Sequence, residues 1–175
     1  MPGFIQDKLE IKFLILYIAA RVEEPAPYDA ILDLTLCDDA IDYFDFSECL
    51  ADLVRTEHLT LSDSGLYSIT GKGRRNGAAC ESSLPYSVRQ RCDKNLEAWN
   101  RKLRRQRQVK ASVEERTNGT YTLRLQLTDD KGGVMDLKLM MVDRAQAKAA
   151  AKRFREAPEK VYGQIVQLFL PENQP

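Results

Sequence analysis

The stretch LTLSDSGLYSITGKGRRNG, residues 59–77, decides how the N-terminal half of the chain is interpreted. Apolar residues alternate with polar ones at Leu59 and Leu61 and resume at Leu66, with Ser-Asp-Ser-Gly between them. Alternation on both sides of such turn residues predicts a β-hairpin. Thr70 then stands where a helix can start, because its hydroxyl can accept a hydrogen bond from the first helical turn. The stretch is therefore expected to form a hairpin followed at once by a helix.

The glycines and basic residues of GKGRRNG, residues 71–77, raise the question of a phosphate-binding loop. A dinucleotide-binding loop needs G-x-G-x-x-G, and here Gly77 comes one position late. A P-loop ends in Gly-Lys-Ser/Thr, whereas Gly71 and Lys72 are followed by Gly73. We therefore interpret the glycines as letting the chain turn sharply out of the hairpin, and we expect no nucleotide cofactor.

Three helices are expected before the hairpin, at about 6–22, 28–37 and 43–57. Asp42 is placed to cap the third helix, and Asp45 follows three residues later, as in a capping box. The apolar residues of the third helix share one face: Phe46, Leu50, Leu53 and Val54.

The C-terminal half begins with a longer helix, expected at about 86–107, whose last two turns are strongly basic. It carries a narrow apolar stripe: Val88, Cys92, Leu96, Trp99 and Leu103. Three alternating segments follow, and the second has Tyr121, Leu123, Leu125 and Leu127 on one face. Two helices then begin at Asp143 and Pro158. This order predicts a three-stranded antiparallel sheet with two helices.

The predicted fold class is therefore α+β, in three parts. Residues 1–83 form the first domain, residues 84–107 are a connecting helix that could also mediate dimerisation, and residues 108–175 form a small βββαα domain.

Composition narrows the classes of function. The chain has 175 residues, 30% of them charged, and its longest apolar run is too short to span a bilayer, so we expect a globular protein in the cytoplasm without a membrane partner. The four cysteines match no common zinc pattern, and His58 is the single histidine, so neither a metal nor a cofactor is expected. Ser82 and Ser83 lack the setting of a nucleophile, and we expect no enzyme.

The net charge of zero hides a strong asymmetry. Residues 1–80 carry a net charge of −7, residues 81–110 carry +6, and residues 111–175 carry +1. Between Glu23 and Glu57 there are eleven acidic residues and one basic residue. Such an asymmetry bears on the choice of partner rather than on the fold.

Three helices, a tight hairpin and a further helix resemble a winged helix, a variant of the helix-turn-helix. LYSITGKGR, residues 66–74, is similar to the junction between wing and helix in bacterial regulators of the PadR and MarR groups. The whole chain also resembles a bacterial family of unknown function with an N-terminal winged helix. That likeness rests on DKLEIKFLILYI (7–18), DYFDFSECLADLV (42–54), YSITGKGR (67–74) and MDLKLMM (135–141).

The resemblance implies a dimeric DNA-binding transcription regulator in which helix 43–57 enters the major groove. Ser47, Glu48 and Arg55 would then lie nearest the bases, and Lys72, Arg74 and Arg75 would contact the phosphate backbone. The helix at 86–107 would be the dimer interface, with Leu96, Trp99 and Leu103 buried in it. Alternatively, that stripe packs within one chain against the C-terminal sheet. The C-terminal domain could sense a ligand or stabilise the dimer.

The acidic helix 43–57 argues against DNA binding, since duplex DNA carries one negative charge per ~1.7 Å of its axis. The alternative is a protein-interaction module that kept the winged-helix fold and lost DNA binding. Its acidic face would bind a basic protein partner, or the basic segment of a second copy.

Overall fold

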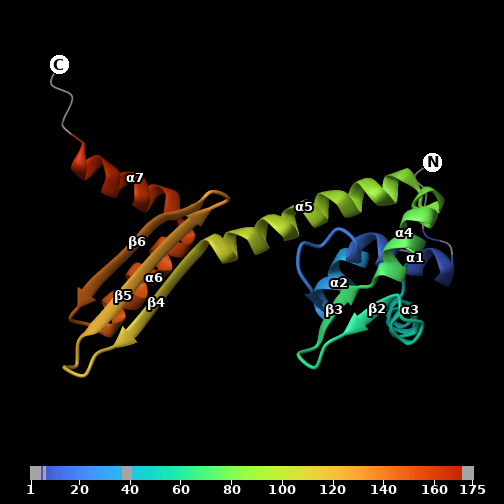
Figure 1. The fold of residues 1–175 in the computed structure, drawn as a ribbon, viewed down its shortest axis with the longest axis horizontal. Helices are drawn as coiled ribbons and strands as arrows, with labels where there is room; N and C mark the ends of the chain where they lie inside the picture. The colour runs from blue at the N-terminus through green and yellow to red at the C-terminus, as the bar shows by residue number, and fades with distance from the viewer. Residues whose placement is uncertain (1–4, 6, 37–40, 171–175) are drawn as a thin grey trace, which may run out of the picture. The chain divides into compact units, whose positions relative to one another are not determined.

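The computed structural model describes residue 5, residues 7–36 and residues 41–170 (Figure 1). Within these residues the chain forms seven α-helices, one 3-10 helix and two three-stranded antiparallel sheets. The predicted α+β class is thereby confirmed. The chain divides into two compact units, unit 1 (Met1–Lys102) and unit 2 (Leu103–Pro175). The helix predicted as a connector contributes residues to both units.

Unit 1 is helical with one small sheet. Its elements in chain order are α1 (Lys8–Ala19), β1 (Ala26–Pro27), α2 (Tyr28–Thr35), α3 (Tyr43–Arg55), β2 (Leu59–Leu61), β3 (Leu66–Ile69), α4 (Gly71–Cys80), η1 (Glu81–Ser83) and the first part of α5 (Tyr86–Gln108). The three helices, the hairpin and the helix after it are those that the sequence predicts, with ends that differ by up to three residues.

Side-chain caps fix where these helices begin. The Asp42 carboxylate accepts a hydrogen bond from the amide of Phe44 at 2.7 Å, and the Thr70 hydroxyl accepts one from the amide of Gly73 at 3.0 Å. Both predicted caps are confirmed. Asp45, expected to complete a capping box, instead lies 3.1 Å from the ammonium group of Lys8.

The strand β1 was not predicted. It pairs antiparallel with β3, Ala26 opposite Tyr67 and Pro27 opposite Leu66, so the strand order is β1-β3-β2. Two residues are too few to show alternation, and the surrounding proline and glutamate residues are typical of a break. Proline is tolerated here because β1 is an edge strand.

Helix α1 is the centre of the unit 1 core. Leu14, Ile15 and Ile18 are completely buried, and α1 packs against α2, α3 and α4. A helix that is apolar on most sides needs such surroundings. Leu96 of α5 is buried in the same core and Trp99 packs against it. Two of the three side chains predicted at a dimer interface are therefore occupied within their own chain, against the N-terminal helices rather than against the C-terminal sheet.

Unit 2 is a three-stranded sheet covered on one face. Its elements are the end of α5, β4 (Val109–Glu115), β5 (Tyr121–Asp129), β6 (Gly132–Met141), α6 (Arg144–Glu156) and α7 (Pro158–Phe169). Leu123 and Leu125 of β5 are buried against Phe154 and Ala151 of α6. The alternation of β5 correctly predicted which face is covered.

Candidate functional site

Helix α3 presents a continuous strip to solvent. Phe46, Leu50 and Leu53 point into the core and are at most 3% exposed. The residues at spacings of four, three and four on the other side are all exposed: Phe44, Glu48, Ala51 and Arg55. We call these four residues the α3 strip. It runs along three turns, so a groove-shaped partner could contact it without displacing a core residue.

The carboxylates of α3 are paired with cations from its surroundings. The Lys8 ammonium lies 2.6 Å from Glu48 and 3.1 Å from Asp45. Asp52 forms ion pairs with Lys12 and Arg55.

The pKa values of these groups shift in the direction that pairing requires. Hydrogen bonds to Glu48 and then Asp45 raise the pKa of Lys8 above its ordinary value. Hydrogen bonds from Lys12 and then Arg55 lower the pKa of Asp52. Three carboxylates thus face three cations, and this side of α3 carries no net charge.

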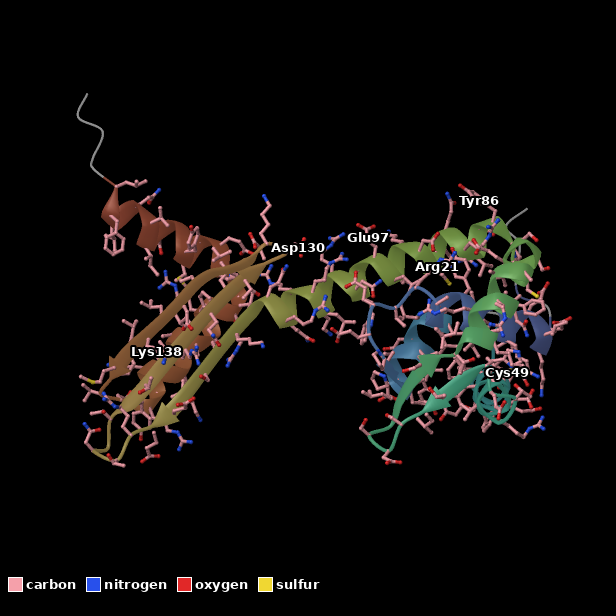
Figure 2. All side chains as sticks on the ribbon, in the orientation of Figure 1. Arg21, Cys49, Tyr86, Glu97, Asp130 and Lys138 are labelled. Atoms are coloured by element: carbon pink, nitrogen blue, oxygen red, sulfur yellow. The ribbon has the colours of Figure 1, made fainter. Side chains whose placement is uncertain are left out.

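The buried side of α3 holds no reactive group. Cys49, labelled in Figure 2, is fully buried, and its thiol donates to the main-chain carbonyl of Lys8 at 3.4 Å. Burial raises the pKa of this thiol, which keeps it protonated and unreactive. Cys49, Cys80 and Cys92 are free thiols, and Cys37 lies outside the described residues.

Of the residues predicted nearest the bases, Glu48 and Arg55 lie on the α3 strip and Ser47 does not. The Ser47 hydroxyl donates to the carbonyl of Tyr43 at 2.9 Å and lies 2.6 Å from the Tyr28 hydroxyl of α2. These contacts hold the half-buried Ser47 between α2 and α3. Its hydroxyl therefore joins the two helices and is not part of the exposed strip.

Sequence reasoning missed two aromatic residues at the start of α3. Phe44 is 77% exposed and Tyr43 is 50% exposed, and their rings meet edge to face with centroids 5.7 Å apart. A signal was present, because Phe44 stands two residues before the buried Phe46. Two residues correspond to about 200° around a helix, so both rings cannot share one face.

Two of the three predicted phosphate contacts bind helix ends. The Lys72 ammonium donates to the carbonyl of Thr56 at 2.8 Å, just after α3, and Arg74 donates to the carbonyl of Ala20 at 3.3 Å, just after α1. Cations at helix C-termini satisfy free carbonyls and the helix dipole. Arg75 is exposed on α4 and is not involved in either of these contacts.

His58 links α3 to α4 through a short polar chain. Its Nδ1 lies 2.9 Å from the Thr56 hydroxyl, which itself donates to the carbonyl of Asp52. Its Nε2 lies 2.8 Å from the amide nitrogen of Asn76. With Asn76 as the donor, Nε2 accepts and Nδ1 carries the proton, so this chain fits the neutral imidazole.

The single histidine is expected to titrate below its ordinary pKa of 6.5. Burial first, and then the ammonium of Lys72, lowers the pKa of His58. Because the folded-state pKa is depressed, this contribution to stability is present above about pH 6.5 and is lost as the pH falls through the folded-state pKa. Proton NMR of the imidazole should give the lowered value, and Lys72→Gln should move it part of the way back. A midpoint at or above 6.5 would contradict the burial of this ring.

The hairpin between β2 and β3 brings no positive charge. Its tip is formed by Ser62–Gly65 and includes Asp63, and residues 59–69 contain no lysine or arginine. A cation of unit 1 that contacts phosphate must therefore come from outside this hairpin. Among the described residues no group of three or more His, Cys, Asp or Glu side chains could hold a metal ion. Nor does any helix in the described ranges have the length and apolar character needed to cross a membrane.

These features define an α+β protein with an exposed, charge-balanced helix strip. The chain belongs to the family described as Domain of unknown function (DUF4364), whose profile matches residues 11–169. This match extends through both units and agrees with the expectation of an uncharacterised family. No curated protein and no solved structure matches the chain.

Proposed function

We propose that unit 1 is a winged-helix DNA-binding domain and that the protein is a transcription regulator. The order α1-β1-α2-α3-β2-β3 is the order that a winged helix requires, with α3 in the place of the recognition helix and the β2–β3 hairpin in the place of the wing. This function needs neither a catalytic centre nor a cofactor, and it would place the protein with DNA in the cytoplasm.

The observation that carries the proposal is the neutralisation of α3. The acidic sequence argued that DNA would repel this helix, but Lys8, Lys12 and Arg55 balance its three carboxylates. A helix without net charge can approach the major groove, which is wide enough to admit it.

The strip also offers the contacts that groove binding uses. Phe44, at the first turn, is suited to the methyl group of thymine, because apolar side chains read that group in the major groove. Arg55, at the last turn, can reach a phosphate or a guanine edge. Arg75 of α4 would add a phosphate contact, and Lys72 lies beside the end of α3. These few cations favour weak, salt-sensitive binding.

Fluorescence anisotropy with a random-sequence duplex at low and moderate salt tests the proposal. We expect a dissociation constant on the order of 10⁻⁴–10⁻⁶ M, the range of non-specific binding at physiological salt. The double variant Arg55→Ala with Arg75→Ala should weaken binding and reduce the slope of log K against log salt by about 2, since each lost phosphate contact removes about one unit.

A matched control removes the same charge from unit 2. Arg116 and Lys131 lie exposed in the two turns of the second sheet, and Arg116→Ala with Lys131→Ala should leave binding unchanged. If the control loses as much affinity as the test variant, binding depends on the net charge of the chain and not on these two residues of unit 1. A folded protein that ignores duplex DNA at low salt would reject the proposal.

A protein-interaction module is the second candidate. It is favoured by the wing, which has Asp63 at its tip and no cation, and by Phe44, which is 77% exposed on the strip. An exposed aromatic residue on a charge-balanced helix is also suited to a protein partner. This candidate becomes the better one if the protein does not bind the duplex.

A further inference from the structure

Strand β6 is an open edge of the unit 2 sheet. Among the described residues, the order β4-β5-β6 leaves the outer side of β6 without a neighbouring strand, and β6 is ten residues long (Figure 1). The other edge is better covered, because α6 packs mainly on β4 and β5 and Arg155 donates to the carbonyl of Ala111 in β4. An edge strand of this length is a template for pairing with another strand.

The end of β6 also exposes large apolar side chains. Leu139 is 43% exposed and Met140 is 57% exposed, and Val142 just beyond the strand is 73% exposed. Edge strands that stay unpaired are usually short, kinked or protected by charges. β6 has the opposite character at this end, which is the character of an edge suited to pairing with another strand.

Of the two charged residues of β6, Asp136 is paired with a cation on β5, whereas Lys138 faces a like charge there. Asp136 and Lys138 both lie on the sheet face that α6 does not cover, and Arg124 binds Asp136 with a shortest distance of 2.6 Å. Lys138, labelled in Figure 2, stands directly opposite Arg124 in the pairing of β5 with β6. Like charges directly opposite one another destabilise a sheet. Lys138 therefore lacks a carboxylate on the strand beside it and would gain from one on its outer side.

We propose that β6 pairs antiparallel with β6 of a second copy about a twofold axis at Leu137, forming a continuous six-stranded sheet. In this register Asp136 stands opposite the partner's Lys138, and the symmetry repeats that pair. Met135 stands opposite the partner's Leu139 on the face that α6 covers, which shields part of the exposed apolar surface. Each such cross-strand pair stabilises the sheet.

The charge pattern selects this register from its neighbours. A twofold axis perpendicular to the sheet pairs residues whose side chains lie on the same face. The axis therefore runs between one residue and its own copy on the partner strand, and not at a point between two successive residues. With the axis at 136 or at 138, Asp136 or Lys138 would face its own copy, which places like charges opposite each other. Only the axis at 137 pairs opposite charges at both positions.

Charge reversal tests the proposal with the 175-residue chain in sedimentation equilibrium. Asp136→Lys leaves two lysines on β6 and Lys138→Asp leaves two aspartates, so either variant alone opposes like charges across the axis. We expect the wild-type chain to dimerise and each single variant to raise the dimer dissociation constant at least tenfold. An equimolar mixture of the two should form a heterodimer, because lysine then faces aspartate at all four positions.

The mixture separates a lost interface from a damaged fold. A misfolded variant would not recover a partner on mixing, and circular dichroism should show both variants folded. A monomeric wild-type chain would overturn the proposal, and so would a dimer that neither variant weakens. The assay contains no DNA, so its result is independent of the proposed function of unit 1.

Discussion

Replacing Gly73 with alanine is expected to lower the free energy of unfolding of unit 1 by about 2 kcal/mol or more. A Cβ atom at Gly73 would lie 2.2 Å from the carbonyl oxygen of His58 and 2.9 Å from Cγ1 of Ile69. The carbonyl cannot simply move away, because it accepts a hydrogen bond from the amide of Thr70 at 3.0 Å. This clash outweighs the gain of about 1 kcal/mol that alanine gives in a helix.

Gly71→Ala is the matched control, two residues earlier in the same helix. The atom nearest to its Cβ would be a terminal nitrogen of the flexible Arg75 side chain at 3.6 Å, which is ordinary contact. We expect a change within about 1 kcal/mol, towards higher stability. Urea unfolding followed by Trp99 fluorescence measures both variants. Equal destabilisation by the two substitutions would show that close approach is not the reason for glycine at 73.

The sequence located most elements because their signals are local. Asp42, Thr70 and Asp143 each accept a hydrogen bond from the first turn of the helix that they begin, and each was predicted from residue type and position. Strand β1 was not predicted, because it is stabilised by pairing with a segment that is distant in the sequence. Ala26 and Pro27 form a strand only because β3 lies beside them after forty residues of chain.

The charges of α3 could be counted from the sequence but not paired. Lys8 and Lys12 lie forty positions before Glu48 and Asp52, and only the packing of α1 against α3 brings them together. The sequence therefore showed the carboxylates of α3 without the lysines that pair with them. For the same reason the roles of Lys72 and Arg74 at helix ends were not visible, since their carbonyl partners come from distant segments.

The stripe on α5 shows a related limit. The spacing correctly predicted that other residues would cover Leu96 and Trp99. An amphipathic pattern does not show whether those residues belong to the same chain or to a second copy. The structure covers both with the core of unit 1. A dimer interface on α5 would need side chains beyond these two, which makes the edge of β6 the better candidate.

Phe154→Ala is expected to unfold unit 2 at much lower denaturant while leaving unit 1 intact. Phe154 is 1% exposed and belongs to a small hydrophobic cluster whose other buried members are Leu123, Leu125 and Ala151. Removing a buried phenylalanine costs about 3–5 kcal/mol, which is a large share of the 5–15 kcal/mol that stabilises a typical domain. Because the Phe154 ring packs α6 against the sheet, its removal should detach α6 from the sheet.

Two probes distinguish the units in this experiment. Trp99 is the single tryptophan and packs in the core of unit 1, so its fluorescence reports on that unit, whereas far-UV circular dichroism reports on both. Phe154→Ala should split the dichroism transition and leave the Trp99 transition in place. Phe46→Ala, which removes a fully buried ring from α3, should do the reverse. If Phe154→Ala shifts the Trp99 transition by the same amount as the dichroism, the two cores unfold as one cooperative body, since a local loss in unit 2 cannot otherwise reach a ring in unit 1.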